Sequence, residues 1–122
     1  MCKLVSSELI GNNGKIAEIK KSAIENIIVS APLCDSIARI VLFGSCTKER
    51  CNERSDIDIA VFGKIPKNKC LSSLSYRKFI SELNSFNDYA ESYDVLYFQD
   101  GKVNNSSVMD DINEGVLIYA SK

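Results

Sequence analysis

The sequence predicts an α/β fold in which strands and amphipathic helices alternate along the chain. Two observations support this prediction. The 122 residues have an ordinary globular composition, with 45% hydrophobic and 25% charged residues. The apolar periodicity also switches between the helical and the strand type from one segment to the next. The length fits one domain, and no repeat, low-complexity tract or linker divides the sequence. We therefore expect a single domain over residues 1–122.

The first expected helix covers residues 15–30. Its apolar side chains form one stripe with charges on the opposite side, the stripe comprising Ile16, Ile19, Ala23, Ile24 and Ile27. Residues 39–43 are short, apolar and rich in β-branched side chains, and they stop at Gly44-Ser45. That pattern predicts a buried strand that runs into a turn. Residues 46–54 are strongly polar, and both a short helix and a loop fit them.

The alternation over residues 55–62 predicts a second strand. Its apolar side chains fall on one face, whereas Asp56 and Asp58 project from the other face. The remaining expected elements, in order, are a lysine-rich loop over 64–70, a helix over 71–86, a strand over 93–98, a turn over 99–102, a helix from Ser106 or Ser107 through Glu114, and a terminal strand or arm over 116–119.

The charged and titratable residues exclude several kinds of chemistry. The chain has 15 Lys and Arg, 16 Asp and Glu and no His, for a formal net charge of −1. Without His there is no Ser–His–Asp or Cys–His catalysis, no His-ligated zinc and no imidazole general base. Any chemistry must therefore use carboxylates, Lys, Tyr, Cys or a bound metal.

The cysteines and the apolar segments predict the compartment. Five cysteines at irregular spacing do not form a secreted disulfide framework, and they fit reduced thiols in a cytoplasmic protein. The N-terminus lacks the apolar core of a signal peptide, and no apolar run reaches the ~18 residues of a membrane span. We expect a cytoplasmic protein with no membrane partner. Direct nucleic-acid binding is not expected, because the domain is not basic.

The charges are segregated along the sequence. Residues 64–81 contain five basic side chains and no acidic one, namely Lys64, Lys67, Lys69, Arg77 and Lys78. Acidic side chains predominate over residues 82–122. Such a distribution either steers a charged partner to one face or forms ordinary solvated surface.

The candidate site lies in residues 42–63. Gly44 and Ser45 end one strand, ten residues follow, and Asp56 and Asp58 open the next strand. A glycine turn lets the backbone approach a phosphate closely, and a serine hydroxyl adds a donor. Two carboxylates two residues apart on one strand face repel each other unless a cation lies between them. Mg²⁺ suits such oxygen ligands, and Asp94, at the start of the next strand, completes a candidate two-metal site for displacement at phosphorus.

This arrangement resembles the signature of the DNA polymerase β-like nucleotidyltransferase superfamily. The motif covers 15 residues, from Gly44 to Asp58, and the order of elements from about residue 15 onwards is also similar. The resemblance implies a polymerase β-like nucleotidyltransferase fold, with a small mixed sheet flanked by helices. At this length the chain resembles the minimal nucleotidyltransferase (MNT) proteins, which are antitoxin partners of HEPN-domain ribonuclease toxins.

The resemblance also implies roles for individual residues. Asp56, Asp58 and Asp94 would be the catalytic acids that bind divalent metal, with Mg²⁺ in a two-metal site. Gly44 and Ser45 would hold the nucleoside triphosphate, assisted by Ser55. Family members often carry Arg directly after Gly-Ser and a Gly soon afterwards, whereas this loop continues with Cys46 and has no Gly. Two nearby basic residues could replace that phosphate contact, namely Lys48 and Arg50.

The implied function is transfer of AMP from ATP to a hydroxyl, expected to be a Tyr side chain, on a cognate HEPN toxin, which would thereby be neutralised. The partner would be that toxin, in a possible hetero-oligomer. One alternative is a non-catalytic antitoxin that neutralises the toxin by stoichiometric binding, and the altered loop favours this alternative. Another is nucleotidyl transfer to a small molecule. That alternative ranks lower because related enzymes carry a substrate-binding region for which we find no counterpart in these 122 residues.

Overall fold

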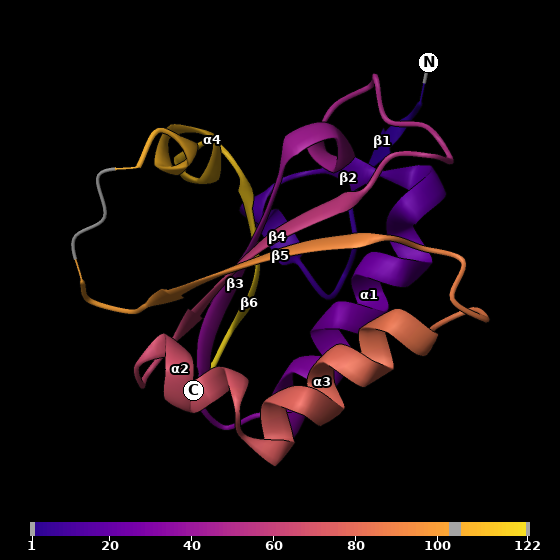
Figure 1. The fold of residues 1–122 in the computed structure, drawn as a ribbon. Coiled ribbons are helices and arrows are strands. Elements are labelled where there is room, and N and C mark those ends of the chain that lie inside the picture. The colour runs from indigo at the N-terminus through magenta and orange to yellow at the C-terminus, as the bar shows by residue number, and fades with distance from the viewer. Residues whose placement is uncertain (1, 103–105, 122) are drawn as a thin grey trace.

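A four-stranded mixed β-sheet forms the centre of the protein, here described from a computed structural model over residues 2–102 and 106–121 (Figure 1). Its strand order is β5-β4-β3-β6. The strands are β3 (Ile37–Phe43), β4 (Ile57–Gly63), β5 (Tyr93–Gln99) and β6 (Val116–Ala120). Strands β4 and β5 are parallel, and β3 pairs antiparallel with both β4 and β6. The mixed α/β architecture confirms the predicted fold class.

Helices cover the sheet unequally on its two faces. Helices α1 (Lys21–Ser30) and α3 (Leu74–Ser85) pack against each other on one face, over the larger of two apolar clusters (Figure 1). The short helix α4 (Val108–Asn113) packs on the other face, where its Ile112 joins a smaller cluster around Phe43 and Phe62. The face that carries the smaller cluster is therefore the more open side of the sheet.

The strand alternation predicted over residues 55–62 is confirmed. Ile57, Ile59 and Val61 are fully buried in the larger cluster, beneath α1 and α3. Phe62 belongs to the smaller cluster on the opposite face. Because successive side chains of a strand alternate between faces, Asp58 projects on the face of Phe62.

The parallel pairing of β4 with β5 requires a crossover connection, which α2 (Lys67–Leu71) and α3 provide. Helix α3 begins where the Ser73 side chain accepts a hydrogen bond from the Tyr76 amide at 3.3 Å. Tyr76, Phe79 and Leu83 are buried along its inner face. The predicted helix over 71–86 is thus confirmed from residue 74, whereas the lysine-rich segment before it is partly helical and not simply a loop.

The prediction of a helix from residue 15 was wrong at its start. Residues Ile16–Ala17 form β2, which pairs antiparallel with β1 (Leu4–Val5). A 3₁₀ helix over Glu18–Lys20 then leads into α1. Ile16 is fully buried, but Ile19, placed on the same helical stripe by periodicity, is 45% exposed. Pairing with β1, which lies outside the predicted helical segment, replaced the local helical preference.

The C-terminal elements agree with their predictions. Helix α4 ends before Gly115, and β6 follows directly. Ser107 takes the N-cap position of α4, although its side chain makes no capping hydrogen bond there. Among the residues described, no helix is both long and apolar enough to cross a membrane.

Candidate active site

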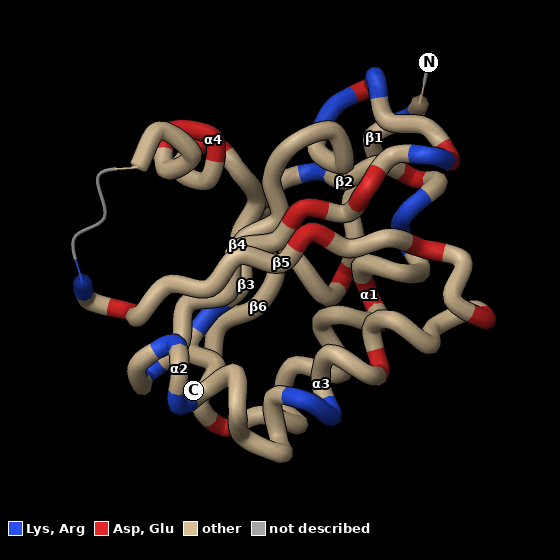
Figure 2. The backbone as a smooth tube through the Cα atoms, in the orientation of Figure 1, with Lys and Arg blue, Asp and Glu red and all other residues tan. Residues whose placement is uncertain are grey.

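Sheet pairing brings the predicted acidic residues together at one end of the two parallel strands. Asp58 of β4 lies opposite Asp94 of β5, and Asp56 directly precedes β4 (Figure 2). Asp58 is half-buried, whereas Asp56 and Asp94 are exposed. Residues far apart in sequence therefore form one acidic cluster, which consists of Asp56, Asp58 and Asp94 and is named the carboxylate cluster below.

The three carboxylates interact electrostatically. Burial raises the pKa of Asp58, and the negative charges of Asp94 and Asp56 raise it further. Each neighbouring negative charge disfavours ionisation of the central carboxyl. The carboxylate cluster therefore concentrates negative charge that a cation would neutralise.

Gly44 lies directly against the central carboxylate. Its φ of +75° falls in the left-handed region, and a Cβ at this position would overlap Oδ2 of Asp58. The contact follows from register, because Phe43 pairs with Asp58 across β3 and β4. Gly44 then opens a 3₁₀ turn that ends at Thr47, whose hydroxyl donates to the Gly44 carbonyl at 2.8 Å.

The serines predicted to bind nucleotide have structural partners in the loop. The Ser45 carbonyl accepts a hydrogen bond from the Lys48 amide at 2.9 Å. Ser55 closes a turn with Asn52, accepting from the Asn52 amide through its hydroxyl and donating its own amide to the Asn52 carbonyl, both at 3.0 Å. Ser55 thus shapes the approach to Asp56.

The two basic loop residues face a small pocket beside the glycine turn. This pocket has a volume of about 90 Å³. Its lining residues are Gly44, Thr47, Lys48, Arg50, Asp111 and Glu114. The structure therefore brings Lys48 and Arg50 to the glycine turn, whereas Ser45 and Ser55 do not line the pocket. Asp111 and Glu114 come from α4 and its C-cap and were not predicted, because no motif in the sequence links them to residues 44–50.

Comparison with known protein families identifies this arrangement. The family model described as "Polymerase beta, Nucleotidyltransferase" matches residues 23–122. The chain belongs to this family. The match includes all four strands of the main sheet, the glycine turn and the carboxylate cluster. Among curated proteins, none matches the chain.

A buried lysine of this nucleotidyltransferase holds the segments that lead to the carboxylate cluster. Lys20 is only 2% exposed, and its Nζ lies 2.5 Å from Oε1 of Glu91 and 3.0 Å from the Glu53 carbonyl. Glu53 is three residues before Asp56, and Glu91 is three residues before Asp94. Lys20 thereby links the segment that leads to Asp56 with the segment that leads to Asp94. The sequence pattern does not indicate this role, because a lysine on the polar side of an amphipathic segment is normally exposed.

In this nucleotidyltransferase, two buried cysteines pack inside the loop that connects Gly44 to Asp56. Cys46 Sγ lies 3.4 Å from the Asp56 carbonyl, to which it donates, and 3.9 Å from Cys51 Sγ. Burial is the main cause that raises the pKa of Cys46, and the neighbouring Cys51 raises it further. The thiol is therefore protonated at neutral pH and contributes by packing and by its contact with Asp56.

The carboxylate cluster of the nucleotidyltransferase has suitable chemistry for a hard divalent cation, because it offers only oxygen donors beside a glycine turn. Within residues 2–102 and 106–121, however, no three His, Cys, Asp or Glu side chains are gathered closely enough to hold a metal ion as they stand. Asp56 and Asp94 are exposed, so rotation of their side chains could bring additional oxygens towards Asp58.

Proposed function

We propose that residues 1–122 act as one minimal nucleotidyltransferase domain that transfers AMP from ATP to a hydroxyl of a partner protein, in the presence of Mg²⁺. The observation that supports this proposal best is the position of Asp58. Its carboxylate is close enough to Asp94 and Asp56 to be affected by their charges, and it lies directly against the backbone of Gly44. A cation-binding group thus adjoins a turn that a phosphate can approach.

Each part of the site has a separate task in this proposal. Asp56, Asp58 and Asp94 would hold the metal, which when bound would supply positive charge to the triphosphate. Gly44 would admit the phosphates close to the backbone, and Lys48 and Arg50 would contact them from the pocket. Positioning and charge neutralisation would then provide most of the catalysis.

The reaction is an in-line displacement at the α-phosphorus. The acceptor oxygen forms a bond to that phosphorus while the bond to the oxygen bridging to the β-phosphate breaks, and pyrophosphate leaves. Asp94 is exposed at the start of the edge strand, where its carboxylate could orient the acceptor hydroxyl and receive its proton. No imidazole is required, in agreement with the absence of His.

The proposed acceptor is a Tyr hydroxyl on a HEPN-type ribonuclease toxin, and its modification would neutralise the toxin in the cytoplasm. Support comes from the similarity to minimal nucleotidyltransferases and from the segregated surface charge, which fits a protein partner. A reading frame for such a toxin beside the gene for this chain would identify the candidate partner.

Mass spectrometry of that partner tests the proposal. After incubation with this protein, ATP and Mg²⁺, the partner should gain the mass of one or more AMP groups. Asp56→Asn should abolish the adduct, whereas Asp88→Asn, the same change at an exposed position outside the carboxylate cluster, should retain it. An unmodified partner that is nevertheless neutralised would contradict the proposal.

Neutralisation by binding alone is the second candidate. The small volume of the loop pocket, about 90 Å³, and the two acidic residues that line it favour this candidate, because both disfavour a bound triphosphate. Under this model the double variant Asp56→Asn/Asp58→Asn still suppresses the ribonuclease activity of the partner. Under the enzymatic model, suppression is lost.

A further inference from the structure

One long edge of the sheet lies open along β5. Strand β5 is the outermost strand, and no other strand within the described parts of the chain pairs with its outer side. At the two ends of the β4–β5 ladder, the Ile57 amide donates to the Ser92 carbonyl and the Asp100 amide to the Gly63 carbonyl. Because bonding alternates along a parallel strand, the amides and carbonyls of Tyr93, Val95 and Tyr97 point away from β4.

The opposite edge of the sheet is protected. Asn13 Nδ2 donates to the Leu117 carbonyl of β6 at 3.2 Å, and the register of β3 with β6 shifts between Ile40 and Val41. Side-chain cover and bulges are common means of preventing pairing at a sheet edge. Strand β5 has seven residues, no Pro, Lys or Arg, and a continuous register with β4. The two edges therefore differ in their ability to accept another strand.

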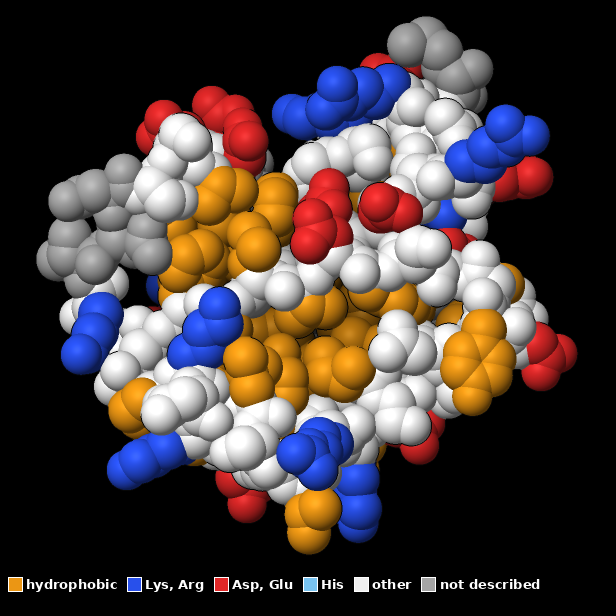
Figure 3. All heavy atoms as spheres, in the orientation of Figure 1, with side chains coloured by type: hydrophobic (Ala, Val, Ile, Leu, Met, Phe, Trp, Pro, Cys, Tyr) orange, Lys and Arg blue, Asp and Glu red, His pale blue; other side chains and the backbone are white. Residues whose placement is uncertain are grey.

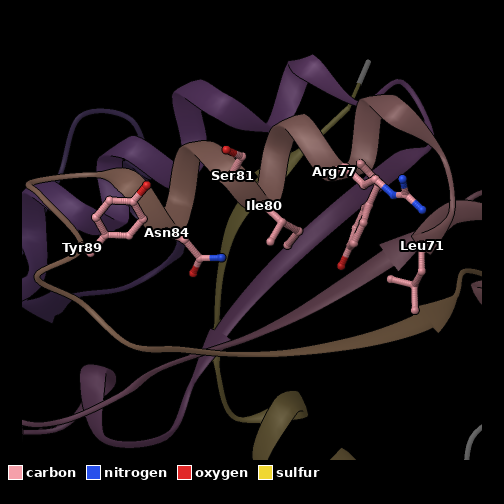
Figure 4. Close-up of a pocket in the computed structure, with 7 residues that line it drawn as sticks. Leu71, Arg77, Ile80, Ser81, Asn84 and Tyr89 are labelled. Carbon is pink, nitrogen blue, oxygen red and sulfur yellow. The ribbon is translucent and has the colours of Figure 1, made fainter.

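A groove of about 490 Å³ runs beside the open edge, beneath α3. Leu71, Ile80 and Tyr89 line it; Leu71 and Ile80 point towards β5, whereas Tyr89 comes from the loop between α3 and β5 (Figure 4). Hydrophobic side chains gather in the hollow between β5 and α3 (Figure 3). Tyr89 is 74% exposed. A strand added to β5 would place every second side chain into this groove.

Charge differs between the two ends of the groove. Arg77 lines the end near α2, where Lys67 and Lys69 are also exposed. Asp88 is exposed at the other end, next to the groove-lining Tyr89, whereas Asp94 projects on the opposite face of the sheet, with Leu96 and Phe98. An acidic segment would therefore be attracted to the end near α2, away from Asp88 and from the strand ends that carry the carboxylate cluster.

We propose that the β5 edge and this groove bind an extended segment of the partner protein by strand addition, a segment with alternating apolar side chains and acidic residues at the end near α2. The inference rests on the proposed function, because such a strand would run beside Asp94, and its side chains that point away from the groove would share the face of the carboxylate cluster and could carry an acceptor hydroxyl towards it. The groove therefore selects the partner, and β5 sets the position of the acceptor.

A second copy of this chain does not fit the same groove. The side chains of Tyr93, Val95 and Tyr97 pack against the larger cluster beneath their own α1 and α3. If two β5 strands paired edge to edge, those side chains would be unable to enter the neighbour's groove, which would stay unfilled. The geometry thus favours an extended segment whose side chains are free on both faces.

Binding of a synthetic probe tests the surface without ATP or metal. The probe is a short fluorescent peptide that alternates Val with Thr and ends in a run of Glu, and the control peptide ends in Lys. Anisotropy should show tighter binding of the Glu peptide. Arg77→Glu should weaken its binding about fivefold, whereas Lys78→Glu, its neighbour outside the groove, should have less than about a twofold effect.

A separate variant and a separate measurement test whether the peptide binds by strand addition to β5. Val95→Pro removes an outward amide and should abolish binding, and circular dichroism would show that the fold is kept. Peptide addition to the wild-type protein should slow hydrogen exchange at the amides of Val95 and Tyr97. Absence of binding, equal binding of both peptides, or a concentration-dependent dimer that Val95→Pro disrupts would overturn the inference.

Failure of this inference can be separated from failure of the proposed function. Asp58→Asn should abolish transfer to the partner protein and leave peptide binding unchanged. If the peptide binds as described but no transfer occurs, the proposed function fails alone. If transfer to the partner is unaffected by both Arg77→Glu and Val95→Pro, the proposed docking surface is wrong, whereas the proposed transferase activity is not contradicted.

Discussion

The backbone of Gly44 lies in contact with the carboxylate of Asp58, with no room for a side chain between them. The contact joins the end of β3 to the start of β4, because Phe43 and Asp58 are paired across these antiparallel strands. It places the turn over Gly44–Thr47 beside the acidic residue whose pKa is raised. The adjacency of turn and carboxylate is the structural basis of the proposed chemistry.

Gly44→Ala should therefore abolish nucleotidyl transfer and destabilise the protein by about 2–4 kcal/mol, through overlap with Asp58 and a left-handed backbone. Gly101→Ala is the matched control, because Gly101 has a φ of +83° and no atom of the residues that the structure describes lies within 4 Å of its missing Cβ. We expect that control to cost only about 1 kcal/mol and to retain activity. Urea unfolding and an AMP-transfer assay measure both effects. Equal costs for the two variants would contradict the role given to the Gly44–Asp58 contact.

Asp58→Asn should abolish transfer but raise the thermal midpoint by a few degrees at pH 7. The raised pKa means that the folded state favours the protonated carboxyl, so the contribution of Asp58 to stability is lost as pH rises through the folded pKa. The gain from the variant should accordingly vanish below about pH 3.8, the unshifted value. Melting curves between pH 3 and pH 7 provide the test.

Addition of Mg²⁺ offers a readout of the same residues without catalysis. Mg²⁺ should raise the melting temperature of the wild-type protein, because a ligand that binds only the folded state stabilises it. Asp58→Asn should lose this increase, and Asp88→Asn should keep it. An equal increase in the melting temperature of all three proteins would show that Mg²⁺ binds outside the carboxylate cluster.

Lys20→Met should reduce stability by about 3 kcal/mol, because it leaves the carboxylate of Glu91, 16% exposed, without its partner. Activity should fall as well, since Lys20 links the segments before Asp56 and Asp94. Lys21→Met, at the next residue, should change stability by less than about 0.5 kcal/mol. Denaturant unfolding and transfer assays compare the two. Full activity of Lys20→Met would show that Lys20 does not position the carboxylate cluster.

Stability should also decline above pH 10 because of buried tyrosines. Burial, followed by the charge of Glu91, raises the pKa of Tyr93 from 10.0 to about 12. Its contribution is therefore complete below pH 10 and is lost as pH rises towards 12. Tyr93→Phe should reduce this loss, whereas Tyr89→Phe, at a side chain that is 74% exposed, should not.

The Tyr93 variant carries a second expectation at neutral pH. The hydroxyl of Tyr93 is buried and makes no hydrogen bond within the described residues. Removing a buried polar group that lacks a partner should leave stability unchanged or increase it by about 1 kcal/mol. Urea unfolding at pH 7 measures this change. A clear loss of stability in Tyr93→Phe would indicate that the hydroxyl has a favourable contact in solution.

Much of the fold was predictable because most helices and strands show a clear apolar pattern within their own residues. Residues 55–62 alternate, and residues 74–85 have a helical apolar stripe with a serine cap. The start of α1 was not predictable in this way. Ile16 fits a helical stripe, yet Ile16 and Ala17 pair with Val5 and Leu4, and no local pattern reveals such a pairing.

The residues of the candidate site also fall into those that a local pattern predicts and those that it does not. The acidic residues and the glycine turn follow a compact spacing in sequence, so residues 44–58 and Asp94 could be proposed together. Lys20, Asp111 and Glu114 could not, because each reaches the site region only through tertiary packing. A buried lysine also contradicts the general expectation that lysines are exposed.

Transfer from position-labelled ATP tests the central claim most directly. The protein is incubated with its partner, Mg²⁺ and ATP labelled either at the α- or at the γ-phosphate, and label on the partner is counted. Nucleotidyl transfer predicts α-label on the partner, γ-label only in released pyrophosphate, and no label with Asp58→Asn. Transfer of the γ-label, or no transfer by a folded wild-type protein that binds its partner, would contradict the account.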